Sequence, residues 1–292
     1  MQKNTFSRTL QIQFLQINGV KTAFYTNFSD SSFRENFPTL LLVHGINGSH
    51  FGLEFLAGNL AKDFNLILVD LPGHGKSDIG EFSKDPSISN LRTWFSVVVE
   101  FSRKLARNTY FGIISHSFGC YAISPEISRK YPVIFICPVP TVPNFSRRIG
   151  KLLVKLFTKK RIARSYNWTP LSALRGDMML KNASRENRLR QYFVAESDRK
   201  TSPKFREFQA ILATSAFRGE NFCSIEPRMV IYGKYDFVPT EKTHSDFKTV
   251  FPNATIREIP SGHLPTTEQP ELLAKIIREN LLKWRQDEKN SR

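Results

Sequence analysis

Two kinds of hydrophobic pattern alternate along this chain. Short runs that are apolar at nearly every position occur at residues 39–44, 65–70, 110–115 and 133–137. Between them, apolar residues recur every three or four positions, at residues 51–62, 88–107 and 118–130. The short runs suit strands covered on both faces, and the longer segments suit amphipathic helices. The alternation predicts an α/β fold built on a doubly wound, mainly parallel sheet.

The two ends of the chain extend this sheet. Near the start, Leu10, Ile12 and Phe14 alternate with polar residues, and the Asn18-Gly19 pair is typical of a two-residue hairpin turn before a return strand at 20–26. Towards the end, strands are predicted at residues 228–232 and 255–259, followed by helices at 240–250 and 271–287. Pro270 suits the first position of the last helix.

An insertion interrupts the alternating pattern after residue 137. Pro138, Pro140 and Pro143 break the sheet pattern, and about 80 residues follow with helical but no strand signals. We therefore predict a core of residues 1–138 and 222–292, carrying a helical, basic cap at residues 139–221. This division is an expectation from pattern alone.

Composition places the chain among folded, soluble proteins. Its 292 residues are 40% hydrophobic and 23% charged, and no run approaches the roughly 20 apolar residues of a membrane span. The first residues lack the long apolar block of a signal peptide. The three cysteines, Cys120, Cys137 and Cys223, are too few and too scattered for a disulfide framework or a zinc site. We expect a cytoplasmic protein without a metal or other cofactor.

Positive charge gathers in the predicted cap. The chain has a formal net charge of +16, and residues 138–220 hold 18 Lys and Arg against 6 Asp and Glu. Residues 149–161 combine apolar positions at helical spacing with five Lys and Arg. This basic amphipathic helix favours a lid over a cleft, with contact to an anionic membrane surface or to nucleic acid as the less favoured alternatives. A solvated basic face without a dedicated partner is equally compatible with the charge.

Candidate chemistry begins at Ser117. A buried strand ends there in a Ser-x-Ser-x-Gly pentad, in which small residues stand two positions before and after the serine. Such a serine lies on a sharp turn between strand and helix, where its hydroxyl is exposed as a nucleophile. A serine hydroxyl needs a base to remove its proton and a carboxylate to orient that base.

The partners of Ser117 are expected at the carboxyl ends of other strands. Asp236 follows the strand at 228–232, and His263 follows the strand at 255–259. Their order along the chain is serine, acid, histidine, which is the order of the α/β-hydrolases. Asp246 and Glu241 lie close to Asp236 and are the alternatives for the acid.

Four further segments make the resemblance specific. Residues 41–49 resemble the His-Gly oxyanion loop of the α/β-hydrolase superfamily, and residues 70–77 match its Asp-x-Pro-Gly-His-Gly-x-Ser segment. Residues 233–239 are similar to its acid loop, and residues 262–263 to its histidine loop. One departure is Ser115, which replaces the usual first glycine of Gly-x-Ser-x-Gly. The resemblance covers nearly the whole chain.

The resemblance implies roles for individual residues. Ser117, Asp236 and His263 would form a catalytic triad, with the backbone N–H groups of Ile46 and Phe118 as the oxyanion hole. In the same family, the residue corresponding to Asp70 is usually structural. His44, His74 and His116 are assigned no catalytic role, because we expect the first two to shape their loops and His116 to point away from the serine.

We therefore predict a serine hydrolase that cleaves a carboxylic ester, lactone or thioester through an acyl-serine. A small-molecule substrate, anionic or carrying an acyl chain, would suit the basic cap. The leading enzymatic alternative is a carbon–carbon bond hydrolase of a diketone-like acid. A ligand-binding or signalling protein with this fold is the alternative of another class. Gly75-Lys76-Ser77 does not predict a nucleotide site, because the phosphate-loop spacing is absent.

Overall fold

The computed structural model describes residues 9–107, 109–140, 208–209, 212, 222, 224–236 and 247–291. Within these residues, eight strands form one sheet in the order β1-β2-β4-β3-β5-β6-β7-β8. From β4 onwards all pairings are parallel, whereas β1 and β2 join the sheet antiparallel. The strands are β1 (Gln11–Ile17), β2 (Val20–Thr26), β3 (Thr39–Val43), β4 (Asn65–Val69), β5 (Phe111–His116), β6 (Val133–Ile136), β7 (Met229–Gly233) and β8 (Thr255–Ile259). The predicted α/β fold with a mainly parallel sheet is confirmed.

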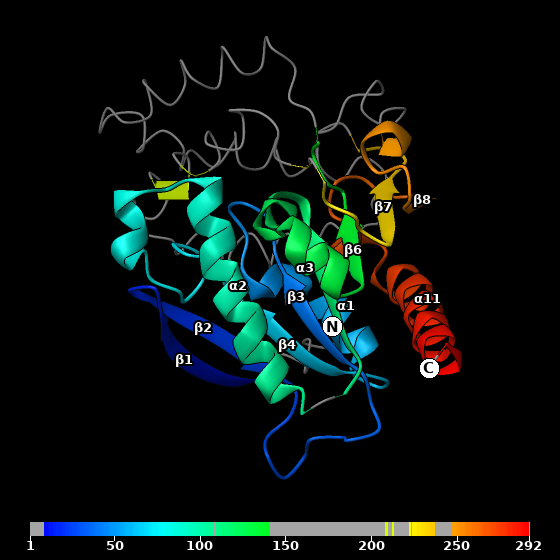
Figure 1. Cartoon of the computed structure of the whole chain (residues 1–292), viewed down its shortest axis with the longest axis horizontal. Coiled ribbons are helices and arrows are strands. Elements are labelled where there is room, and N and C mark those ends of the chain that lie inside the picture. The colour runs from blue at the N-terminus through cyan, green and yellow to red at the C-terminus, as the bar shows by residue number, and fades with distance from the viewer. Residues whose placement is uncertain are drawn as a thin grey trace, which may run out of the picture.

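Helices cover both faces of the sheet (Figure 1). On one face, α2 (Ile88–Leu105) and α3 (Pro125–Lys130) pack over the alternate strand positions that include Leu41 and Ile113. On the other face, α1 (Glu54–Leu60) and α11 (Pro270–Asn290) pack over positions such as Leu40 and Leu42. Because both faces are covered, the central strands are apolar at consecutive positions.

The predicted amphipathic helix at 88–107 forms as α2. Ser87 caps it by accepting a hydrogen bond from the Asn90 N–H at 3.2 Å. Trp94 and Val98 are buried on its inner stripe, together with Leu91 and Phe95. At the start of the chain, Asn18 and Gly19 both have positive φ, as the predicted hairpin turn requires.

The single helix predicted at 118–130 is wrong. The structure has a 3-10 helix, η4 (Ser117–Ala122), and then α3, with Ile123 and Ser124 extended between them. The residue before a proline is pushed out of the helical region, and Pro125 imposes this on Ser124. Ser124 then caps α3, and Pro125 fits its first turn.

Several elements differ in length from the sequence prediction. The helix expected at 51–62 consists of a 3-10 turn, η2 (His50–Leu53), followed by α1, and the last helix extends to Asn290. Two short additional helices, η3 (Gly80–Lys84) and α10 (Pro265–Glu268), lie in loops. Residues 247–250 of the helix predicted at 240–250 are helical, whereas residues 240–246 and nearly all of the predicted cap, 139–221, lie outside the described residues. Among the helices of the described residues, none is long and apolar enough to span a membrane.

Candidate active site

Ser117 lies on a strained turn at the end of β5. Its φ is +51°, a left-handed value that is uncommon for a residue with a side chain. The strand leads straight into η4 at this residue, so the backbone reverses direction within one position. This conformation is the one that the sequence predicts for a nucleophile elbow.

Two small residues make the turn possible. A Cβ atom on Gly119 would lie 2.5 Å from the carbonyl oxygen of His44 and 3.1 Å from Ser115 Oγ. Only glycine fits such a close approach. Because Gly119 has no side chain, the Ser115 hydroxyl fits in the place where the family usually has a glycine. The Ser115 hydroxyl is fully buried and has no hydrogen-bond partner among the described residues.

The sheet brings the predicted acid and histidine to the same edge as Ser117. Asp236 follows β7 and His263 follows β8, and these strands run parallel to β5. His263 Nε2 lies 2.8 Å from Ser117 Oγ, and His263 Nδ1 lies 2.8 Å from Asp236 Oδ2. All three side chains are buried. A carboxylate can only accept, so Nδ1 donates to Asp236 and Nε2 is left to accept the serine proton.

The loop after β3 packs directly on the elbow. A Cβ atom on Gly45 would lie 3.0 Å from the Cβ atom of Ser117. Ile46, the next residue, is partly buried against the core, and Phe118 is buried beside Ser117. Of the two residues predicted to supply oxyanion donors, Phe118 adjoins the serine in η4, and Ile46 follows the glycine that packs against the serine.

Comparison with known proteins agrees with this geometry. Residues 40–276 match the model of the alpha/beta hydrolase family. The chain belongs to the alpha/beta hydrolase family. The match covers most of the chain, including the elbow, Asp236 and His263.

Individual proteins similar to this alpha/beta hydrolase share a third or less of its residues over the matched part. A Haemophilus influenzae protein described as an esterase or lipase is 24% identical over 85% of this chain and 84% of its own. An Arabidopsis thaliana 1-acylglycerol-3-phosphate O-acyltransferase is 33% identical, but the match spans 37% of this chain and only about a quarter (25%) of the acyltransferase. The enol-lactonase from Burkholderia xenovorans has the same fold, with a TM-score of 0.71, 14% identity and coverage of 93% and 100% of the two chains.

Asp70 holds the neighbouring loops of this hydrolase. Its buried carboxylate accepts hydrogen bonds from the backbone N–H groups of His50 at 2.7 Å and Lys76 at 2.9 Å, and from the Tyr25 hydroxyl at 2.7 Å. Burial alone would raise the pKa of Asp70, but the hydrogen bonds and the positive potential at His50 lower it well below its usual value. Asp70 contacts none of the triad residues through these bonds, which agrees with a structural role.

His44 and His74 shape their loops, as the sequence predicts. His44 Nδ1 donates to the Gly45 carbonyl at 2.7 Å, and Nε2 accepts from the Leu71 N–H at 3.0 Å. His74 Nδ1 donates to the Pro72 carbonyl at 2.8 Å. Burial lowers the pKa of both imidazoles, that of His74 to about 3, so both are neutral.

Two residues near Ser117 and His263 hold the histidine loop: His116, to which the sequence assigned no catalytic role, and Glu268, which it did not single out. His116 Nε2 lies 2.9 Å from the carbonyl oxygen of His263. The buried carboxylate of Glu268 accepts hydrogen bonds from the Gly262 N–H at 2.9 Å and the Leu264 N–H at 3.3 Å. In the sequence, His116 adjoins the nucleophile and Glu268 lies five positions after His263. These positions alone do not show which groups the two side chains contact.

One group of metal-ligating side chains gathers within the described residues. Ligand atoms of Cys137, Asp236 and His263 lie within 4.8 Å of one another. Asp236 and His263 already bond each other, and burial beside Asp236 raises the pKa of the Cys137 thiol well above its usual value. The group is therefore the acid end of the triad with a neutral thiol beside it. The expectation that the hydrolase needs no metal stays a prediction.

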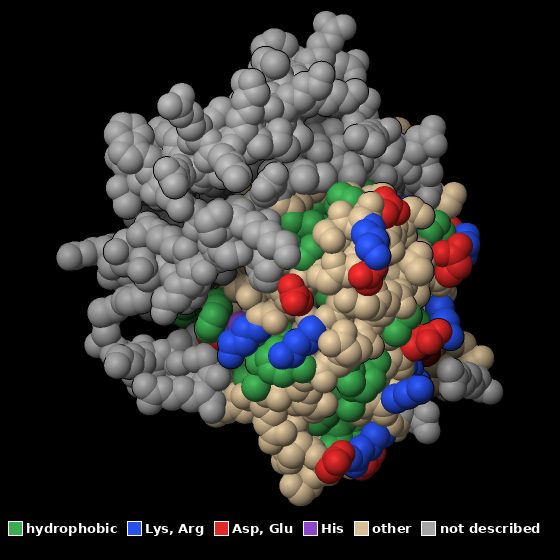
Figure 2. Space-filling view, turned by 90° about the vertical axis from the view of Figure 1, so that its left-hand side faces the viewer, with side chains coloured by type: hydrophobic (Ala, Val, Ile, Leu, Met, Phe, Trp, Pro, Cys, Tyr) green, Lys and Arg blue, Asp and Glu red, His purple; other side chains and the backbone are tan. Residues whose placement is uncertain are grey.

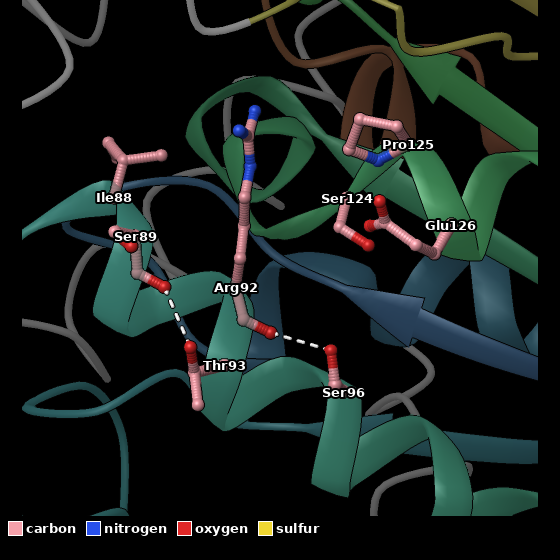
Figure 3. Close-up of a pocket in the computed structure, with 8 residues that line it drawn as sticks. All are labelled: Ile88, Ser89, Arg92, Thr93, Ser96, Ser124, Pro125 and Glu126. Atoms are coloured by element: carbon pink, nitrogen blue, oxygen red, sulfur yellow. Dashed lines mark hydrogen bonds between the residues drawn. The ribbon is translucent and has the colours of Figure 1, made fainter.

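A polar hollow of about 430 Å³ lies between α2 and the start of α3. Its lining includes Arg92, Ser96 and Glu126 but none of the triad residues. Figure 3 shows the Thr93 and Ser96 hydroxyls bonded to helix carbonyls. On the face shown in Figure 2, Lys and Arg side chains of described residues are interspersed with Asp and Glu. The described residues of the hollow and of this face form no further built site.

Proposed function

We propose that this protein is a serine hydrolase that cleaves a carboxylic ester, lactone or thioester through a covalent acyl-serine. The observation that carries the proposal is the continuous chain of hydrogen bonds from Asp236 through His263 to Ser117, with 2.8 Å at each step. The strained elbow at Ser117 and membership of a hydrolase family support it. The esterase or lipase from Haemophilus influenzae is a relative of the same type.

In the proposed cycle, His263 Nε2 removes the proton from Ser117 Oγ as the oxygen attacks the substrate carbonyl. Negative charge develops on the carbonyl oxygen, which accepts hydrogen bonds from the Ile46 and Phe118 N–H groups. The imidazolium then protonates the leaving group, and an acyl-serine remains. A water molecule activated by His263 releases the acid, while Asp236 stays ionised throughout.

The cap is part of the proposal. We assign residues 139–221 as a helical lid over the cleft, next to the core of residues 1–138 and 222–292. The positive excess of this segment, 18 basic against 6 acidic residues over 138–220, favours an anionic small-molecule substrate. Gln209, one of its described residues, donates to the Gly73 carbonyl at 2.7 Å, which ties this segment to the core.

Acyl transfer is a second candidate, favoured by the match to the Arabidopsis acyltransferase. The acyl-serine would then be attacked by an alcohol instead of water. The two activities share every step up to the acyl-serine, so they are separated by product analysis. In a mixture of an acyl donor and a glycerol-based acceptor, hydrolysis gives free acid and transfer gives a new ester.

The nucleophile is tested with a fluorophosphonate probe. We expect the native protein to be labelled at Ser117 and the Ser117→Ala variant to be unlabelled. Ser115→Ala is a matched control, because it removes a second buried hydroxyl from the same pentad and should leave labelling intact. Equal labelling of the native protein and Ser117→Ala would contradict the proposal. A native protein that does not label would favour the ligand-binding alternative.

Substrate class is tested by hydrolysis of p-nitrophenyl esters of increasing chain length, lactones and thioesters. We expect turnover of at least one of these classes by the native protein and none by Ser117→Ala. Turnover of a carboxylate-bearing diketone without turnover of any ester, lactone or thioester would instead indicate the carbon–carbon bond hydrolase.

A further inference from the structure

His263 is held at its backbone as well as at its side chain. Its carbonyl oxygen lies 2.9 Å from His116 Nε2, while its imidazole lies 2.8 Å from Ser117 Oγ. Two consecutive residues of the elbow thus contact the same histidine at two points. Because a carbonyl oxygen can only accept, the proton of His116 is on Nε2.

Glu268 also holds the histidine loop. Gly262 N–H lies 3.0 and 2.9 Å from the two carboxylate oxygens, and Leu264 N–H lies 3.3 Å from one of them. These are the residues directly before and after His263. The carboxylate is buried, with 2% of Glu268 exposed, so these charge-assisted bonds are shielded from water.

From this arrangement we infer that His116 and Glu268 are positioning residues that set the distance between the nucleophile and the base. The inference rests on the proposed function and adds to it a reason for the residue types at 116 and 268. In the histidine loop, His116 bonds the His263 carbonyl and Glu268 bonds the neighbouring N–H groups. Asp236 bonds the His263 imidazole. A rotation of the loop would move Nε2 away from Ser117 Oγ, and a misplacement of about 1 Å can cost about 100-fold in rate.

His116 can hold the loop as a neutral donor near neutral pH. Burial, together with a smaller effect of the positive potential of His263, lowers its pKa to about 3. The imidazole therefore stays neutral, and it donates from Nε2 without adding a charge that would repel the imidazolium formed on His263 during the reaction.

The central experiment compares His116→Leu with His116→Gln. Glutamine retains an N–H donor at about the same distance from the backbone, whereas leucine does not. For the native enzyme's preferred p-nitrophenyl ester, we expect His116→Leu to lower kcat by about 10- to 100-fold with little change in KM. The fluorophosphonate labelling rate should fall in parallel, and His116→Gln should recover most of both.

Loss of stability is controlled with Ile277→Val. Ile277 is buried in α11 as part of the hydrophobic core, and its side chain has no group that could join the hydrogen bonds of the histidine loop. This variant should lower the melting temperature without lowering kcat. If His116→Leu reacts as fast as the native enzyme, or if glutamine is as slow as leucine, the positioning role of the His116 donor is wrong. If the native protein neither labels nor turns over esters, the proposed function fails and this inference fails with it.

Glu268 is tested by a double-variant cycle. Both contacts act on the same loop, so their losses should not multiply. We expect Glu268→Gln and His116→Leu each to lower kcat, and the double variant to lose less than the product of the two single losses. A fully multiplicative loss would show that the two residues act on different features and would overturn the shared role.

Discussion

At the scale of single residues, Asp236 determines which nitrogen of His263 carries the proton. Its Oδ2 accepts from Nδ1 at 2.8 Å, which leaves Nε2 free of a proton and facing Ser117. An amide at this position would donate to Nδ1 and favour the opposite tautomer. We therefore expect Asp236→Asn to lower kcat by about 10⁴-fold with little change in fold.

The same measurement tests the choice of acid. Asp246 and Glu241, the alternatives from the sequence, lie outside the described residues. Asp246→Asn and Glu241→Gln should keep native kcat and fluorophosphonate labelling. A large loss in either of them, with Asp236→Asn active, would transfer the role of the acid to that residue.

Ser115 is a departure from the family pentad with a defined structural setting. Its buried hydroxyl lacks a partner among the described residues and lies opposite Gly119. Replacement by glycine removes this unpaired group but adds backbone freedom, and the two effects oppose each other. We expect Ser115→Gly to change kcat less than twofold and the unfolding midpoint in urea only slightly. A large loss of activity would give the hydroxyl a role at the elbow.

Glu54 makes stability depend on pH. Burial raises its pKa from 4.5 to about 7, and its Oε1 has no partner among the described residues. The pKa of Glu54 is higher in the folded state than in the unfolded state. The contribution of Glu54 to the free energy of unfolding is therefore fully present below pH 4.5 and is lost as pH rises to about 7. Glu54→Gln should remove this dependence. We compare the unfolding free energies of Glu54→Gln and the native protein by urea unfolding. The difference between them should shift in favour of Glu54→Gln by on the order of 3 kcal/mol between pH 4.5 and 8.

The meeting of the three residues proposed as the triad could be predicted from sequence, because each lies next to a strong pattern. Ser117 ends an apolar run, and Asp236 and His263 follow the last two strands in the expected order. His116 and Glu268 could not be predicted in the same way. The contact of His116 joins the elbow to a loop almost 150 positions later along the chain, and no periodicity records it. Glu268 lies only six and four positions from Gly262 and Leu264, but the sequence pattern does not show that its carboxylate bonds their N–H groups.

At the scale of elements, the break between η4 and α3 depends on two residues. Ser124 accepts a hydrogen bond from the Ile127 N–H at 3.3 Å, and Pro125 begins the helix. Ser124→Ala should lower the unfolding free energy by about 1 kcal/mol, because an N-terminal N–H loses its acceptor. Ser124→Asn should retain the cap. Urea unfolding of both variants, with kcat as a check that the elbow is intact, tests the assignment.

The strands could be predicted more accurately than the helices of this fold. Runs such as 39–44 and 65–70 are apolar on both faces, so their pattern matches a buried parallel strand directly. The sequence predicts one continuous helix after the elbow because apolar residues continue through the break between η4 and α3. Pro125 carried the missing information, since it forces the preceding Ser124 to be extended while fitting the first turn of a new helix.

At the scale of the whole molecule, charge is distributed unevenly along the chain. The net charge is +16, and most of the excess falls at residues 138–220, the segment proposed as the lid. A positive lid would raise the local concentration of an anionic substrate, and salt would screen this attraction. For a matched pair of esters, one anionic and one neutral, kcat/KM of the anionic ester should fall as ionic strength rises, while that of the neutral ester stays nearly constant.

Charge reversal separates the lid from the rest of the surface. Lys151→Glu with Lys155→Glu changes the predicted basic helix, whereas Lys283→Glu with Lys289→Glu makes the same change of charge on α11. If the lid attracts the substrate, only the first pair should lower kcat/KM for the anionic ester, and neither should affect the neutral one. Equal losses from both pairs would show a general effect of net charge. The native protein could instead bind anionic vesicles or DNA in a salt-sensitive way. If the first pair abolished this binding without changing kcat/KM, the basic helix would belong to a surface that binds macromolecules.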